Sequence, residues 1–249
     1  MQANIKEVVD LIRQAKHLVV LTGAGISAES GVPTFRDAQT GLWAKFRPED
    51  LATPEAFWKN PTFVWEWYQW RRQLIEKVQP NPGHLALASL ENWVPKLTLI
   101  TQNVDNLHQK AGSHRVIELH GNIMRSKCSV EMILVEPPKD HDEAIPRCPH
   151  CGSYLRPDVV WFGETLPKEA WMEAEEAART ADVFLSVGTS SVVYPAASLP
   201  WTALSQGASV VEINPEETPL SNHVTFALAS KAGEILPDII VQLNVIITK

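Results

Sequence analysis

Short apolar runs alternate with segments of helical periodicity along most of the chain. Residues 2–15 place isoleucine and valine at the spacing of one buried helical face, and residues 17–22 then form a continuous apolar run. A run of that kind is typical of a strand buried on both faces of a sheet. Further runs and helical stretches follow, the runs at 97–101, 116–119, 183–187, 210–213 and 224–228 and the helices at 82–90, 167–178 and 195–205. Strands that alternate with helices predict a parallel, doubly wound α/β sheet.

Two stretches interrupt this alternation. Residues 37–83 are rich in tryptophan, and Asn60 is suited to cap a helix that starts at Pro61. That helix carries an apolar stripe at Phe63, Trp67, Trp70, Leu74 and Val78. Residues 124–160 contain all three cysteines, several prolines and little periodicity. We predict that this helical module and this cysteine-bearing module form a small domain over a Rossmann-like domain, which comprises residues 1–36, 84–123 and 161–249.

The composition narrows the class of protein. With 249 residues and 45% hydrophobic content, the chain is long enough for one sizeable core with a satellite domain. The net charge is −7 and no run of lysine and arginine is long enough for a phosphate-binding stripe, so direct nucleic-acid binding is not expected. No apolar stretch approaches the roughly 20 residues that span a bilayer, and the N-terminus lacks the apolar core of a signal peptide. We therefore expect a cytoplasmic protein without membrane contact.

A glycine-rich loop follows the first predicted strand, where a doubly wound sheet binds a dinucleotide. Residues 23–28 read Gly-Ala-Gly-Ile-Ser-Ala, and glycines let backbone N–H groups approach a pyrophosphate closely. The loop alone is equally compatible with a tight strand-to-helix turn. Pro33 then ends any helix early, and the chain presents Phe35 and Arg36. An aromatic and an arginine beside a phosphate site suggest a cover for the cofactor, which hydride transfer does not need, so a dehydrogenase is disfavoured.

Polar side chains follow two further predicted strands. Residues 101–108 contain two amides and a carboxylate at the end of one strand, and His120 ends the next. Because ligands bind outside the carboxyl ends of parallel strands, we expect both groups to converge on the cofactor. A single histidine at a strand end is more often structural. Buried amides and carboxylates are costly in a core, however, so these neighbours favour a functional site.

These motifs resemble those of the sirtuin family in order and spacing, and the resemblance covers nearly the whole chain. Within that family, the chain resembles the bacterial deacylase branch most closely. Sirtuins use NAD to remove acyl groups from protein lysines: they cleave the bond between nicotinamide and ribose and trap the ribose with the acyl oxygen. The matching segments are 23–27, 31–36, 101–105, 118–121, 148–152, 160–164, 188–190 and 213–215.

The resemblance implies roles for individual residues. His120 would be the general base on a ribose hydroxyl, for which imidazole has a suitable pKa. Asn103 and Asp105 would bind the ribose and the nicotinamide amide, and Phe35 would shield the reactive carbon. The implied NAD-binding residues are Gly23, Ala24, Gly25, Ser27, Phe35, Arg36, Gln102, Asn103, Asp105, Gly188, Thr189, Ser190, Asn214, Glu216 and Ala232. An extended substrate peptide would dock on a strand edge formed by Val160, Trp161, Phe162 and Gly163.

Tyr68 and Arg71 are spaced three residues apart on the tryptophan-rich helix and share one face. A phenol and a guanidinium together suit a carboxylate, although an aromatic packed on the stem of a surface arginine is a common alternative. The pair resembles the Tyr-x-x-Arg motif of sirtuins that remove succinyl and malonyl groups, and Thr34 fits that branch. Arg72 lies about 100° away around the helix and is left out. The resemblance implies a preference for acidic acyl groups, with some deacetylation retained.

The cysteines resemble the paired Cys-x-x-Cys zinc knuckles of the family and imply a zinc-ribbon-like module. Cys128 is followed by Glu131 where a fourth cysteine is expected, and Cys148 is followed by Cys151. Three thiolates with one carboxylate are less usual for structural zinc. Three free thiols in a metal-free module are the alternative. Other candidate ligands are His150, His141 and Asp140.

Two other functions use the same features. A mono-ADP-ribosyltransferase would cleave NAD in the same way and transfer the ribose to a different acceptor. A non-catalytic module would bind NAD or acyl-lysine without reaction, although His120 and Asn103 favour an enzyme. A dehydrogenase is a distant third possibility.

Overall fold

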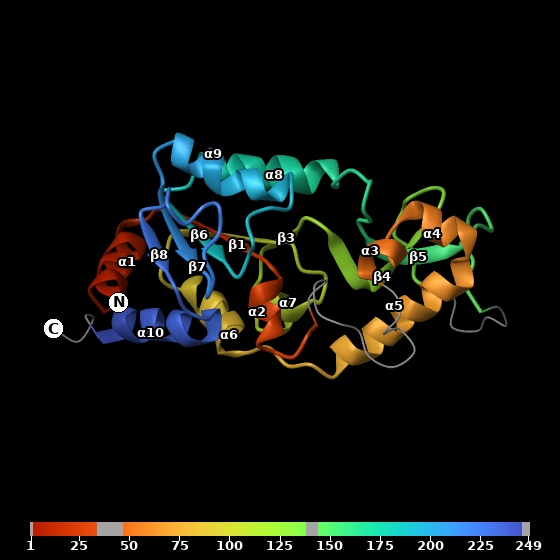
Figure 1. Cartoon of the computed structure of the whole chain (residues 1–249), viewed down its shortest axis with the longest axis horizontal. Helices are drawn as coiled ribbons and strands as arrows, with labels where there is room; N and C mark the ends of the chain where they lie inside the picture. The colour runs from red at the N-terminus through yellow and green to blue at the C-terminus, as the bar shows by residue number, and fades with distance from the viewer. Residues whose placement is uncertain (1, 34–46, 138–143, 246–249) are drawn as a thin grey trace.

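The computed structural model describes residues 2–33, 47–137 and 144–245, and its largest feature is a six-stranded sheet (Figure 1). All neighbouring strands of this sheet run parallel, in the order β3–β2–β1–β6–β7–β8. The strands are β1 (His17–Thr22), β2 (Lys96–Thr101), β3 (Val116–Glu118), β6 (Val183–Val187), β7 (Ser209–Ile213) and β8 (Phe226–Leu228). The predicted doubly wound parallel fold is confirmed.

Helices cover both faces of this sheet (Figure 1). One face packs against α1 (Gln2–Gln14), α6 (Pro82–Leu90) and α10 (Ala232–Val245), and the other against α8 (Lys168–Arg179) and α9 (Leu199–Ser205), which follows the short 3-10 helix η2 (Ala196–Ser198). The pattern analysis did not find α10, because Pro237 within it resembles a helix stop. None of the described helices has the length and apolar character needed to cross a membrane.

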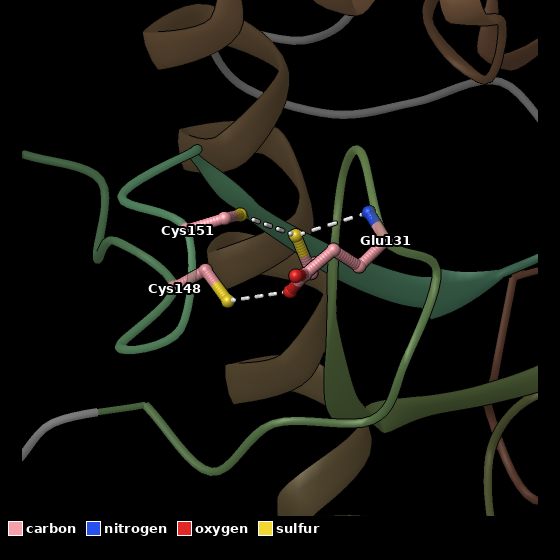
Figure 2. Close-up of side chains that lie close together, drawn as sticks. Glu131, Cys148 and Cys151 are labelled. Carbon is pink, nitrogen blue, oxygen red and sulfur yellow. Dashed lines mark hydrogen bonds between the residues drawn. The ribbon is translucent and has the colours of Figure 1, made fainter.

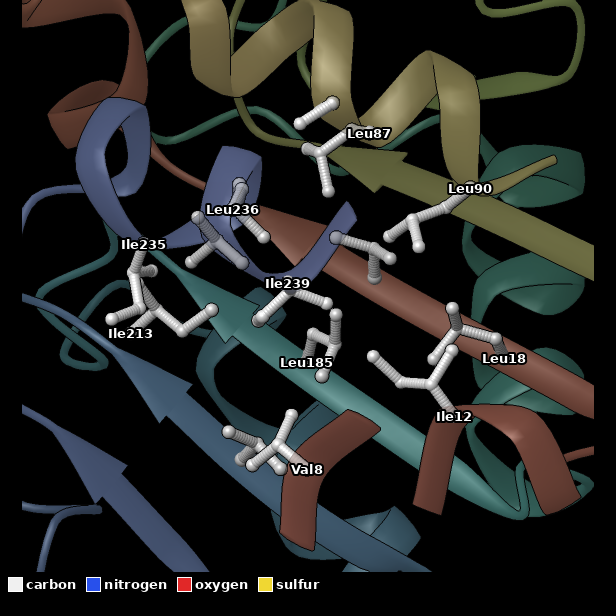
Figure 3. Packing of buried hydrophobic residues seen from close by; sticks show 14 of the residues in the cluster. Val8, Ile12, Leu18, Leu87, Leu90, Leu185, Ile213, Ile235, Leu236 and Ile239 are labelled. Carbon is white, nitrogen blue, oxygen red and sulfur yellow. The ribbon is translucent and has the colours of Figure 1, made fainter. Parts of the chain in front are cut away.

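The position of β1 between two layers of helices explains why its sequence is apolar throughout. Leu18 and Val20 belong to the core under α1, α6 and α10, whereas Val19 and Leu21 belong to the core under α8 and α9. Side chains alternate between the two faces along a strand, so a central strand needs apolar residues at every position. Figure 3 shows Leu18 among the aliphatic side chains of the first core.

A second, smaller unit lies at the far end of the molecule from α1 (Figure 1). Asn60 Oδ1 accepts a hydrogen bond from Phe63 N at 3.2 Å, and Pro61 is the first residue of the helix, as predicted. The antiparallel pair of strands in this unit was not predicted. Its elements are α3 (Pro48–Leu51), α4 (Pro54–Lys59), α5 (Pro61–Glu76), β4 (Gly121–Cys128) and β5 (Leu155–Val159). The domain boundaries given above remain a prediction.

The predicted apolar stripe of α5 is only partly right. Trp67 is buried, but Leu74 is 37% exposed. The two clusters that meet α5 contact it from different sides, one including Trp67 and the other Trp65. The buried residues of α5 include polar side chains, so an apolar pattern alone does not detect this face. They are Val64, Trp65, Trp67, Tyr68, Arg71 and Ile75.

Candidate active site at the carboxyl edge of the sheet

The loops that follow β1, β6 and β7 meet at the carboxyl edge of the sheet. Gly23 N donates to Val187 O at 3.0 Å, and Gly188 N donates to Ile213 O at 2.9 Å. Each loop is therefore fixed by the end of the neighbouring strand. The convergence expected from the sequence follows directly from the parallel register.

The glycines of the first loop are required by the close approach of the loop after β6. A Cβ added at Gly23 would lie 2.7 Å from Gly188 O, and one at Gly25 would lie 2.8 Å from Gly188 Cα. Gly188 itself has a φ of +58°, a conformation that favours glycine. The glycine pattern is thus explained first by contact between two loops of the chain. The short helix α2 (Ala24–Ala28) follows, without a side-chain cap at Gly23.

Ser27 connects the polar residues after β1 and β2. Asn103 Nδ2 donates to Ser27 Oγ and to Gly23 O, both at 2.9 Å. Ser27 also hydrogen-bonds the buried carboxylate of Asp105, whose Oδ1 accepts from Leu107 N at 2.9 Å. Burial raises the pKa of Asp105, and these hydrogen bonds oppose the rise. The amide and the carboxylate are therefore held in fixed positions beside the glycine loop.

His120 follows β3 and lies partly buried at the same edge. Its Nδ1 lies 2.9 Å from Gln102 O. A carbonyl only accepts hydrogen bonds, so Nδ1 carries the proton and Nε2 is left with its lone pair in the neutral ring. Burial lowers the pKa of His120, and the hydrogen bond to Gln102 O partly offsets this. Neutral imidazole with an unprotonated Nε2 is the form that a general base requires.

The remaining residues predicted for the cofactor lie after β6 and β7. Gln102 Nε2 donates to Thr189 Oγ1 at 3.1 Å, which joins the β2 and β6 loops. Asn214 Nδ2 donates to Glu216 O at 2.7 Å. Ala232 is buried at the first turn of α10. Thr34, Phe35 and Arg36 lie outside the described residues.

Three polar residues that support these loops were not found by sequence reasoning. Asn81 Oδ1 caps α6, while its Nδ2 donates to Ile26 O at 2.7 Å and so holds α2. Glu29 accepts from Gly233 N at the start of α10. The buried Glu212 binds the hydroxyls of the loop after β7. An asparagine before a proline at a helix start is a recognisable cap, but the long-range partners leave no mark in the sequence.

Tyr68 and Arg71 both lie on the buried face of α5. Tyr68 is 2% exposed and Arg71 is 8% exposed, so Arg71 is not a surface arginine. Trp161 Nε1 donates to the Tyr68 hydroxyl at 2.9 Å. Burial raises the pKa of Tyr68 to about 12, so the phenol stays protonated. Arg72 instead donates to Ile123 O and joins α5 to β4.

The guanidinium of Arg71 is a cation on α5 that has little contact with solvent. The Arg71 guanidinium carbon lies 5.3 Å from the centre of the Trp67 ring. Burial lowers the pKa of Arg71, and attraction to Tyr68 and to Asp105 opposes this. Arg71 is therefore a buried cation that interacts electrostatically with Tyr68 and Asp105.

The segment predicted to dock a substrate peptide is already hydrogen-bonded on its N–H side. Val160 N donates to His120 O and Phe162 N to Ala52 O, both at 2.9 Å. Trp161 N donates to Glu164 Oε2 at 2.8 Å. A peptide on this segment would therefore meet carbonyl oxygens rather than these three N–H groups.

The three thiols and Glu131 come together in the small unit (Figure 2). One ligand atom from each of the four residues lies within 4.8 Å of every other. Cys128 Sγ is 3.4 Å from Cys151 Sγ, and Cys148 Sγ is 3.5 Å from Glu131 Oε2. Zinc–sulfur bonds of about 2.3 Å in a tetrahedron place sulfurs at such separations, so the donor set fits one zinc ion. His150 is not in this cluster, and His141 and Asp140 lie outside the described residues.

The fold and this edge define a doubly wound α/β protein in which Nε2 of a neutral histidine is left unprotonated at the carboxyl edge of the sheet. The Sir2 family model matches residues 23–195, and the chain belongs to the Sir2 family. The resemblance stated from the motifs is confirmed.

Similar proteins agree with this assignment. The chain is 57% identical over 219 residues to the NAD-dependent protein deacylase of Aquifex aeolicus, covering 87% of this chain and 91% of that protein. A Sir2 homologue solved in complex with NAD is 45% identical, with a TM-score of 0.89 over 97% of this chain and 94% of the other. A Sir2 protein bound to an acetylated peptide is 33% identical, with a TM-score of 0.84 over 96% and 98% of the two chains.

Proposed function

We propose that this chain is an NAD-dependent protein deacylase that acts on acyl-lysine side chains and produces nicotinamide and O-acyl-ADP-ribose. The observation that carries the proposal is the hydrogen bond from His120 Nδ1 to Gln102 O, which prepares Nε2 as a base at the carboxyl edge. Family membership and the deacylase relatives support the reaction class.

The residues at the edge suit NAD. The glycine loop at the start of α2 has no side-chain cap and would let a pyrophosphate approach its backbone closely, although Gly25 N and Ile26 N donate within the protein. The amides of Gln102 and Asn103 suit ribose hydroxyls. NAD, when bound, supplies a ribose carbon whose bond to nicotinamide is weakened by the positive charge of the ring. The residues proposed for the adenosine half are Gly188, Thr189, Ser190, Asn214, Glu216 and Ala232.

The chain's own residues would then orient the cofactor and remove a proton from a ribose hydroxyl. Ser27 hydrogen-bonds Asn103 and Asp105, so their polar groups would bind the ribose and the nicotinamide amide with little reorganisation. His120 Nε2 would take the proton from a ribose hydroxyl, which makes that oxygen nucleophilic toward the bound acyl group. Backbone carbonyls of residues 160–163 would receive the substrate peptide.

The reaction is tested with purified full-length protein, NAD and peptides carrying acetyl-lysine or succinyl-lysine. We expect release of nicotinamide together with one O-acyl-ADP-ribose per deacylated peptide. Nicotinamide release with ADP-ribosylated protein and no acyl product would instead identify a transferase. Absence of nicotinamide release with every peptide would leave only a binding module.

We further propose that the enzyme prefers acyl groups that end in a carboxylate. Arg71 is a buried cation beside the hydroxyl of Tyr68, and a buried guanidinium gains most from an anionic partner. Its electrostatic coupling to Asp105 supports a position at the inner end of an acyl site. Some deacetylation is retained, because a small neutral acyl group meets no repulsion there.

This preference is tested by Arg71→Met, which keeps the length of the side chain and removes its charge. We expect the succinyl-to-acetyl ratio of kcat/KM to fall by about 100-fold, the scale of a lost charge-assisted pair. Arg179→Met is the matched control, because Arg179 is exposed on α8 and pairs only with Glu175 among the described residues. Equal loss of both activities in Arg71→Met would show that Arg71 does not read charge.

We propose that Cys128, Glu131, Cys148 and Cys151 hold one structural zinc ion. The site lies at the end of β4 in the small unit, apart from the residues proposed for NAD, so zinc would supply stability rather than chemistry.

A further inference from the structure

Trp161 and Tyr68 form a buried hydrogen bond between two parts of the small unit. Trp161 follows β5, whereas Tyr68 belongs to α5, and both side chains are 2% exposed. The distance between Trp161 Nε1 and the Tyr68 hydroxyl oxygen is 2.9 Å. The two rings lie close together, with their centres 6.4 Å apart.

The direction of this hydrogen bond is fixed by chemistry. An indole N–H only donates, so the Tyr68 oxygen must accept and its own hydrogen must point elsewhere. The neighbouring Arg71 guanidinium also only donates. Neither of these two groups can receive the Tyr68 hydrogen, and among the described residues no other partner of the hydroxyl is found, so it can donate to an acceptor that enters from outside. A carboxylate is the strongest such acceptor, and Arg71 adds the matching charge.

The indole itself is firmly held. The Arg156 guanidinium carbon lies 3.2 Å from the centre of the Trp161 ring. Arg156 is buried and donates to both carboxylate oxygens of Glu164, and Glu164 accepts from Trp161 N. Phe57 packs at 5.3 Å from the ring centre. The indole N–H therefore has one orientation, toward Tyr68.

We propose that Trp161 is a positioning residue for acyl selectivity, because its indole N–H commits the Tyr68 hydroxyl to donate to a carboxylate. The proposal rests on the preference for acidic acyl groups proposed above. Trp161 acts through Tyr68 and through the side chain, which is separate from any contact of its backbone with a peptide. A neutral acyl group has no carboxylate to receive the Tyr68 hydrogen, so its turnover does not depend on this hydrogen bond.

The test is a double-mutant cycle of Trp161→Phe and Tyr68→Phe, measured with succinyl- and acetyl-lysine peptides. We expect Trp161→Phe to lower the succinyl-to-acetyl ratio of kcat/KM by about tenfold, mainly through KM for the succinyl peptide. In the Tyr68→Phe background the same change should alter the ratio by less than about twofold, because the hydroxyl it acts through is gone.

The possible outcomes distinguish a failure of the role proposed for Trp161 from a failure of the proposed preference for acidic acyl groups. A fallen ratio in Tyr68→Phe with an unchanged ratio in Trp161→Phe would overturn the role of Trp161 alone. Equal effects of Trp161→Phe in both backgrounds would also overturn it, because a packing defect does not need the hydroxyl. Unchanged ratios in both single variants would overturn the acyl preference itself.

Phenylalanine also removes ring area that contacts Arg156 and Phe57, so a second variant isolates the hydrogen bond. Benzothienylalanine in place of Trp161 keeps the shape of indole and replaces its N–H by sulfur. We expect this protein to keep its melting temperature and to show the same loss of selectivity. Retained selectivity in this protein would overturn the proposal even if Trp161→Phe does not fold.

Discussion

The carboxyl edge of the sheet and the small unit are held by different kinds of interaction. The cores beneath the edge are almost entirely aliphatic, and the loops above them are fixed by main-chain hydrogen bonds at strand ends. The small unit instead buries Tyr68, Arg71, Arg156 and Trp161, whose polar atoms depend on one another. Buried polar groups are stable only when they are paired.

The difference predicts where a single substitution acts. At the edge, main-chain hydrogen bonds and supporting side chains such as Asn81 hold the loops, so His120 can lose its chemistry while the fold remains. In the small unit, each polar side chain is also a structural partner, so substitutions affect selectivity and stability together.

His120→Ala should cause the largest effect on activity and almost none on stability. Removal of a general base slows a reaction by about a thousandfold, which applies here to acetyl and succinyl peptides alike. The melting temperature should stay nearly the same, because the side chain of His120 makes one hydrogen bond among the described residues, to Gln102 O. Steady-state deacylation and calorimetry measure the two quantities. His114→Ala is the control, since His114 is exposed and pairs with Glu91. Full activity in His120→Ala would contradict the assignment.

Cys148→Ser should instead act on stability. Loss of one thiolate leaves three donors for a tetrahedral ion, so we expect zinc content to fall from one per chain toward zero. The small unit should lose about 3 kcal/mol or more of unfolding free energy, in the range seen when a structural metal is lost. Elemental analysis and denaturant unfolding provide the measurements. A metal-free wild-type protein with unchanged stability in Cys148→Ser would contradict a zinc site.

The fourth ligand is tested by Glu131→Gln and Glu131→Cys. The glutamine variant should release zinc to a chelator more readily, and the cysteine variant should hold it more tightly, because thiolate is the preferred zinc donor. Glu136→Gln is the matched control, as Glu136 is exposed and outside the cluster. Identical chelator competition in all three proteins would remove Glu131 from the ligand set.

The same comparison explains what the sequence could predict. The sheet was predictable because β1 needs apolar residues on both faces and because parallel strands bring His120 and Asn103 to one edge. The Tyr68 and Arg71 pair was visible from its spacing, but its burial was not. The contact of Tyr68 with Trp161 joins residues 93 positions apart, and no local pattern encodes such a pair. The fourth metal position was marked by spacing alone, and only the fold shows that Glu131 reaches the thiols.

Two buried histidines beneath the carboxyl edge of the sheet should make the free energy of unfolding depend on pH, and this effect is smaller than those above. His84 on α6 and His108 on the short helix α7 (Leu107–Lys110) lie in contact, with ring centres 4.9 Å apart and ring planes tilted by 54°. Burial lowers the pKa of His84 to about 4 and that of His108 to about 3, with repulsion between the two rings adding to the shift of His108.

The unfolded chain protonates these rings near pH 6.5, well before the folded protein does. Their contribution to stability is therefore complete above about pH 6.5 and is lost as the pH falls toward the folded pKa values of about 4 and about 3. Between pH 7 and pH 5, each ring should cost about 2 kcal/mol of unfolding free energy. Urea unfolding at the two pH values should show a loss about 2 kcal/mol smaller in His84→Leu than in the wild type. An equal loss in His84→Leu and the wild type would show that folding does not lower the pKa of His84.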